Sequence, residues 1–137
     1  MFFEASIFAK SLNYKKVELD FGVYYLFDNF FITEVNEGEH FDYPKLNMLL
    51  SSLRAHYGSH KRLAYIANRI HSYSIDPVLW SYFDEDDSIL IAAAIVIYRD
   101  STYLNANIEK QLASIPIKRA QSLNDALNWV SGLKEFN

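Results

Sequence analysis

Apolar residues along the chain form short runs that alternate with stretches of helical spacing. The first run, from Val17 to Phe27, is rich in β-branched and aromatic residues, as is the second, from Phe30 to Val35. Asp28 and Asn29 separate them, and both residue types tolerate the backbone conformations of tight turns. The pattern predicts a β-hairpin that follows a loosely patterned lead-in over residues 1–14.

The stretch after this hairpin has the features of a helix. Pro44 suits a first helical turn, where a missing N–H costs no hydrogen bond. Gly58 is a natural helix end, since glycine readily adopts a left-handed conformation. Between them one apolar stripe recurs at helical spacing and consists of Leu46, Leu49, Leu50, Leu53 and Tyr57.

Three further strand-like runs follow, at Leu63–Ala67, Leu90–Tyr98 and Ile115–Ile117. The middle run is apolar throughout, which is typical of a central strand that is covered on both faces. Pro116 cannot donate a ladder hydrogen bond, so the last run is expected at an edge of the sheet.

The segments between and after these runs have helical features. Asp76 and Pro77 have the chemistry of a helix start. Leu104, Ile108 and Leu112 recur every four residues and predict a further helix. The acidic run Asp84–Asp87 is expected to form a solvated turn. The last helix begins near Ser122 and carries a stripe of Leu123, Ala126, Leu127, Val130 and Leu133.

The predicted order is β-β-α-β-α-β-α-β-α. Strands that alternate with helices indicate an α/β fold with a mixed, mainly parallel sheet of about five strands. No repeat or low-complexity linker interrupts the pattern, so residues 1–137 are expected to form a single domain.

The composition fits such a domain and limits the classes of partner that the chain could bind. Half of the residues are hydrophobic, so the chain can bury a core. The net charge of -4 and the scattered lysines and arginines argue against nucleic acid as a partner. The absence of cysteine excludes disulfides and thiolate metal sites, and fits a cytoplasmic location. The longest apolar run, Ile89–Tyr98, is shorter than the about 20 residues that span a membrane.

The order of elements and five sequence segments resemble the STAS domain, the family named for sulfate transporters and anti-sigma-factor antagonists. The small stand-alone bacterial members of the SpoIIAA type are the most similar in character. The resemblance covers roughly residues 15–133. The segments that carry it are Phe21–Tyr24, Glu34–Gly38, Tyr65–Pro77, Ala94–Val96 and Ser122–Trp129.

This resemblance implies a non-enzymatic regulatory protein that binds other proteins, with a kinase-like or sigma-regulatory partner. In such relatives a partner kinase phosphorylates a serine after the third strand and so controls docking. Ser72 and Ser74 occupy the comparable loop and are the candidate phospho-acceptors. The family's Asp-Ser-x-Gly pattern is absent here, since Asn68 and Arg69 replace the acidic residue and no glycine follows either serine.

Ligands of open parallel sheets favour the edge formed by the carboxyl ends of the strands. Three loops should converge there, at residues 36–40, 68–76 and 99–101. The middle loop is the richest in polar and aromatic side chains. Its candidate ligand- or partner-binding residues, with Arg69 as a possible anion ligand, are Asn68, Arg69, His71, Ser72, Tyr73 and Ser74.

The same residues also have purely structural interpretations. Arg69 can pair with Glu37 or Glu39 across this edge, Asp76 can cap its helix, and the serines can satisfy loop backbone groups. Nothing assembles the polar groups of an enzyme active site, a metal site or a cofactor site. An enzyme is therefore the least favoured class.

Two function classes remain. The first is a protein-binding module with a shallow surface around residues 68–77. The second is a carrier of a lipid or nucleotide, with an enclosed apolar pocket lined by the aromatic hairpin. A homodimer through the edge near Pro116 or through the hairpin face is a further expectation.

Overall fold

A computed structural model describes residues 1–83 and 89–137. The acidic run Asp84–Asp87, expected to be a turn, lies outside these residues. The main sheet has six strands in the order β1-β2-β3-β5-β7-β8, and a two-stranded sheet pairs β4 with β6. The strands are β1 (Lys15–Leu19), β2 (Gly22–Leu26), β3 (Phe30–Val35), β4 (His40–Phe41), β5 (Leu63–Asn68), β6 (Ser74–Ile75), β7 (Leu90–Val96) and β8 (Ile117–Ala120).

The sheet is mixed and mainly parallel, as the sequence predicted. β1, β2 and β3 pair antiparallel, and β3, β5, β7 and β8 pair parallel. The four parallel strands therefore end at one edge of the sheet. β8 lies at an outer edge of the sheet, as expected, but it begins only after Pro116 and spans Ile117–Ala120 rather than Ile115–Ile117.

The prediction of one strand over Val17–Phe27 is wrong, because this segment turns back on itself at Asp20 and Phe21. The sheet therefore has six strands rather than about five. Gly22 lets β2 pack closely against β3, since an added Cβ would come within 2.7 Å of the Glu34 carbonyl oxygen on β3.

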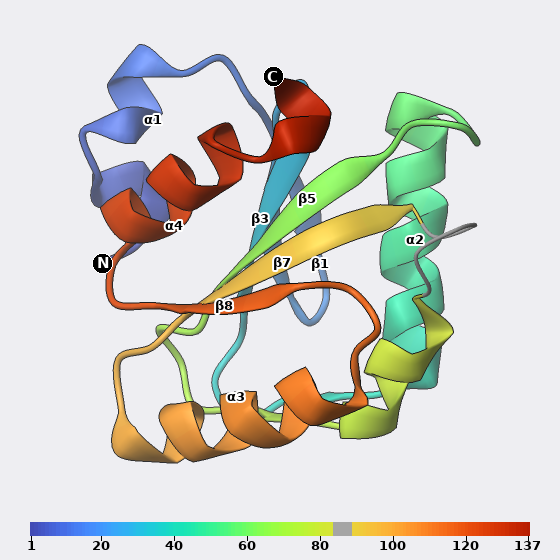
Figure 1. Ribbon diagram of the computed structural model, residues 1–137, viewed down its shortest axis with the longest axis vertical. Coiled ribbons are helices and arrows are strands. Elements are labelled where there is room, and N and C mark those ends of the chain that lie inside the picture. Colours follow the sequence, from blue (N-terminus) through green and yellow to red (C-terminus); the bar gives the residue numbers. More distant parts are fainter. Residues whose placement is uncertain (84–88) are drawn as a thin grey trace.

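Helices cover both faces of the sheet (Figure 1). Helix α2 begins after Asp42, which caps it by accepting from the Lys45 N–H, and ends at Gly58, where φ is 86°. This confirms the expected end of that helix. The helices are η1 (Phe3–Ala5), α1 (Phe8–Ser11), α2 (Tyr43–Tyr57), η2 (Pro77–Tyr82), α3 (Asp100–Leu112), α4 (Leu123–Ser131) and η3 (Lys134–Phe136).

The core has two parts, one on each face of the sheet. On one face α2 and η2 cover side chains such as Phe31 and Ile95. On the other, α4 and the first residues of the chain cover side chains such as Ile32 and Ile66. The lead-in over residues 1–14 is thus part of the packed structure. Its Phe3 is fully buried, although the apolar residues of this segment follow neither a helical nor a strand spacing that would mark it.

The outer face of α3 is apolar and exposed. Leu104, Ile108 and Leu112 expose 63%, 52% and 44% of their surface, although an apolar stripe on a helix usually faces the core. The residues that α3 buries are Thr102, Ala106 and Glu109. The helix is present as predicted, but its stripe faces away from the sheet.

Candidate functional site

The three loops expected at the carboxyl edge of the sheet do converge. The Gly38 N–H donates to the Ser72 carbonyl at 2.8 Å, and β4 pairs in parallel with β6. Arg99 Nη2 donates to the Ile70 carbonyl at 2.8 Å. These contacts join residues 36–40, 68–76 and 99–101, so this prediction is confirmed.

Arg69 is buried in an ion pair with Glu109 of α3. Its Nη1 and Nη2 donate to the two Glu109 carboxylate oxygens at 2.6 and 2.5 Å. Trp80 Nε1 donates to the same carboxylate at 2.7 Å. The sequence offered Glu37 or Glu39 as the partner of Arg69, and this interpretation is wrong. The partner is Glu109, 40 residues further along the chain. Arg69 already holds a carboxylate, supplied by the protein itself.

Asn68 belongs to the opposite face of the sheet from Arg69. Its side chain is buried, and its Nδ2 donates to Glu34 Oε2 at 2.7 Å. His71 lies beside Glu37, with 3.6 Å between Nδ1 and Oε2. Its ring also contacts that of Phe2. Strand alternation thus separates Asn68 from Arg69, whereas His71 lies beside the Glu37 carboxylate that also contacts the neighbouring Ser72.

Ser72, Tyr73 and Ser74 remain near the surface. Both serines are exposed, and Ser74 Oγ shares a hydrogen bond of 2.7 Å with His40 Nδ1. The Ser72 N–H donates to Glu37 Oε2 at 2.7 Å. The Tyr73 ring lies 5.7 Å from the Arg69 guanidinium carbon, within cation–π range. Both hydroxyls of the candidate phospho-acceptors can therefore be reached from solvent.

A groove joins this loop to the apolar face of α3. It has a volume of about 230 Å³, and Ser74 and Ile108 lie on its two walls. Glu109, held by Arg69, lies in the same lining. The groove combines part of the predicted site with a helix that the sequence did not assign to it. Its lining is Tyr73, Ser74, Ile75, Pro77, Asn105, Ile108 and Glu109.

Polar contacts hold α3 in place. Besides the pair of Glu109 with Arg69, Arg119 of β8 donates to Asn107 Oδ1, and its guanidinium stacks 4.6 Å from the Tyr103 ring centroid. These anchors and the small side chain of Ala106 fill the inner side of the helix. The stripe is therefore not needed to attach α3.

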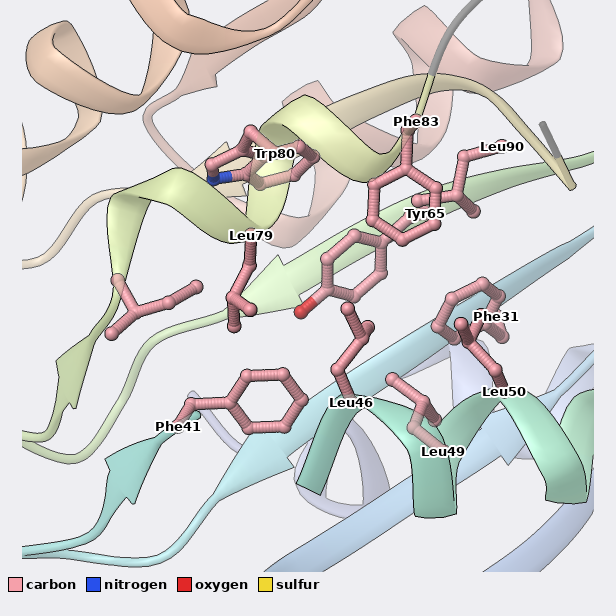
Figure 2. A pocket seen from close by; sticks show the side chains of 11 residues that line it. Phe31, Phe41, Leu46, Leu49, Leu50, Tyr65, Leu79, Trp80, Phe83 and Leu90 are labelled. Carbon is pink, nitrogen blue, oxygen red and sulfur yellow. The ribbon is translucent and has the colours of Figure 1, made fainter. Parts of the chain in front are cut away.

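An apolar pocket lies between α2, η2 and the sheet. Figure 2 shows Tyr65 between the leucines of α2 and the side chains of η2. The volume of the pocket is about 30 Å³, against the roughly 300–1,000 Å³ of typical ligand pockets. Phe31 is the only contribution of the predicted hairpin to its lining. As it stands, the pocket has room for about one water molecule.

Among residues 1–83 and 89–137, no three acidic, histidine or cysteine side chains are grouped so that they could hold a metal ion. No helix in the same part of the chain is both long and apolar enough to cross a membrane.

No family model matches the sequence, and no curated protein does so either. A solved structure does match: an uncharacterised protein of the DUF3478 family from Shewanella loihica PV-4, described as having a SpoIIAA-like fold. The two chains share 9% identity, and the match, with a TM-score of 0.51, covers 87% of this chain and 93% of that one. Identity this low bears on the fold alone. The chain therefore has the SpoIIAA-like, STAS-like fold that the sequence resemblance indicated.

Proposed function

We propose that this chain is a non-enzymatic protein-binding module that docks a partner through the outer face of α3. The exposed stripe of Leu104, Ile108 and Leu112 carries the proposal. A contiguous patch of exposed apolar side chains usually marks an interaction surface. The groove beside Ile108 continues this surface to the loop that contains Ser74.

The partner surface is expected to be apolar and nearly uncharged. Three helical positions around the stripe, Ser101, Asn105 and Gln111, are exposed and uncharged, and the exposed Asp100 lies one turn before Leu104 at the end of the stripe. Depletion of charge at the centre of a patch is the composition typical of protein interfaces. A nucleic acid or an acidic ligand would instead require a cluster of cations.

Ser74 is the candidate through which phosphorylation would control this docking, with Ser72 as the second candidate. Ser74 lines the groove together with Ile108, so a phosphate there would place about two negative charges in an apolar interface. Burying that charge disfavours docking. Ser74→Asp should therefore weaken partner binding, whereas Ser72→Asp, outside the groove lining, should have a smaller effect.

Differential capture tests the docking surface. The baits are the wild-type chain, the double variant Leu104→Ser/Ile108→Ser, and Met48→Ser on α2 as the matched control. Met48 is an apolar residue with 46% of its surface exposed, comparable to the stripe. A partner of the α3 face is a protein retained by the wild type and the control but lost by the double variant, and it must rebind when purified.

Sedimentation of the same three proteins shows whether the occupant is a second copy. A concentration-dependent dimer that only the double variant loses would identify a homodimer. Monomers throughout, together with a capture profile that is identical for all three baits, would contradict the proposal. The alternative function, a carrier of a small apolar ligand, is supported only by the apolar pocket of about 30 Å³.

A further inference from the structure

Three linked polar side chains lie at the carboxyl ends of adjacent parallel strands, on the face that α4 covers. They are Glu34 of β3, Asn68 of β5 and Tyr98, two residues beyond β7. Asn68 Nδ2 donates to Glu34 Oε2 at 2.7 Å, and the Tyr98 hydroxyl donates to Asn68 Oδ1 at 2.7 Å. Ligands of α/β sheets bind at this edge.

Main-chain groups of the first residues complete this network. The Phe3 N–H donates to Glu34 Oε2 at 2.7 Å. The Met1 carbonyl accepts from Asn68 Nδ2 at 2.9 Å and from the Tyr98 hydroxyl at 3.4 Å. Phe2 between them has an extended backbone. The three side chains therefore bind an extended peptide through its N–H and C=O groups.

One ring anchors this segment. Phe3 is fully buried, and its ring centroid lies 4.7–5.4 Å from those of Tyr14, Tyr25 and Phe27. Its neighbours Phe2, Glu4 and Ala5 are exposed. The hydrogen bonds of Glu4 with Lys16 and Tyr25 lie at or near the surface, and exposed ion pairs contribute little. Apart from the Phe3 ring and the main-chain hydrogen bonds of Met1 and Phe3, residues 1–5 make few buried contacts, so removing that one ring should open the segment.

An open groove of about 570 Å³ runs beside the segment at the same edge. Phe2, Glu4 and Tyr25 line it, together with Glu34 and His71. A peptide could approach Glu34 from this groove without disturbing α4. Because the acceptor is a carboxylate, the site selects a ligand that presents N–H groups and disfavours phosphates and carboxylates.

We propose that Glu34, Asn68, Tyr98 and the aromatic pocket of Phe3 form a binding site for an extended peptide that carries an aromatic side chain. In the free protein residues 1–5 occupy this site as a displaceable strap. The site lies on the opposite face of the sheet from the α2 and η2 core, and it does not depend on the role of α3. A competing peptide would take over the hydrogen bonds that Phe3 and Met1 now make.

A labelled peptide with the sequence of residues 1–10 tests this site in trans. The full-length Phe3→Ala variant weakens the strap, so it should bind the peptide saturably and at least about tenfold more tightly than the wild type, whose own strap competes. A peptide with Phe3→Ala should not bind. Adding Glu34→Ala to the chain should abolish binding. Full-length Ile7→Ala, at an exposed position, should behave as the wild type.

The proposal is overturned if folded Phe3→Ala does not bind the peptide, or binds it equally well without its aromatic ring. Native-state hydrogen exchange of the wild type gives a second test should Phe3→Ala not fold. The Phe3 amide should exchange through a local opening far more frequent than the opening that exposes β5 amides. Exchange of Phe3 only together with β5 would overturn the strap.

Discussion

Helices α3 and α4 both carry apolar residues at helical spacing in the sequence, but the two stripes have opposite roles in the structure. Helix α4 lays its stripe on β5, β7 and β8, where Leu127 and Val130 are buried. Helix α3 packs on η2 and β8 with Ala106 and polar anchors, and leaves its stripe in solvent. The difference shows that an amphipathic stripe predicts a helix but not the surface that the stripe contacts.

The two regions also bury their carboxylates differently. Glu109 of α3 faces the cation of Arg69, whereas Glu34 on the α4 face is held by neutral donors, the Phe3 N–H and the Asn68 amide. Burial raises the pKa of Glu34, and the Phe3 and Asn68 hydrogen bonds only partly offset this. The first contact joins two side chains of the packed structure, and the second depends on the segment that we propose to be displaceable.

The largest expected effect comes from removing the anchor of α3. Glu109→Ala leaves Arg69 buried without its counter-charge and the Trp80 N–H without its acceptor, so the free energy of unfolding should fall by about 3–5 kcal/mol. Urea denaturation measures it, with the exposed Asn105→Ala as the control, expected to change stability by less than about 0.5 kcal/mol. A loss below about 1 kcal/mol in Glu109→Ala would show that the pair does not hold the helix.

The next largest effect is the difference in stability when a leucine is removed from the α4 stripe or from the α3 stripe. Leu127→Ala on α4 creates a cavity and should cost about 2–5 kcal/mol in the free energy of unfolding. Leu104→Ala on α3 removes an exposed side chain and should cost less than about 0.5 kcal/mol. Equal costs would mean that the α3 stripe is covered in the folded protein.

The helix starts provide a smaller contrast. Ser122 Oγ accepts from the Asp125 N–H and caps α4, whereas Arg99 precedes α3 without a side-chain cap. Ser122→Ala should therefore lower the free energy of unfolding by about 1 kcal/mol. Ser101→Ala, in the first turn of α3, should leave it unchanged within about 0.5 kcal/mol. Matching losses in both variants would argue against the cap.

The smallest effect concerns Glu34 and pH. Since its folded-state pKa is raised above 4.5, Glu34 favours folding at acidic pH, and this contribution is lost as pH rises through the raised pKa. Glu4 and the hydroxyls of Tyr25 and Tyr98 surround the carboxyl group and are unchanged in Glu34→Gln. The unfolding free energy of the wild type, minus that of Glu34→Gln, should fall as pH increases from 4 to 7. A difference that rises instead would contradict the assigned direction.

Local patterns in the sequence were sufficient for most of the fold. Pro44, Gly58 and the Leu90–Tyr98 run each mark an element that the structure contains, and the three loops meet as expected. The turn at Asp20 was missed although Asp20 and Gly22 are turn-favouring residue types, because only Phe21 separates them and β-branched and aromatic residues resume at once. The short pairing of β4 with β6 is too brief to leave a pattern.

The candidate site was predictable only in part. Loop residues such as Ser72 and Ser74 were found because polar side chains cluster there. The partner of Arg69 was not, because Glu109 is a single acidic residue on a distant helix. The uncharged residues Asn105 and Gln111 beside the stripe were the one sequence feature that could have indicated a binding surface on α3.

The central claim, that the outer face of α3 is a docking surface, is tested most directly by the dissociation constant of the purified partner. Titration against the wild type, Leu104→Ser/Ile108→Ser and Met48→Ser should show at least a roughly tenfold weaker complex for the double variant alone, about 1.4 kcal/mol. All three proteins should unfold at similar urea concentrations. Equal affinity for the wild type and a fully folded double variant would contradict the account.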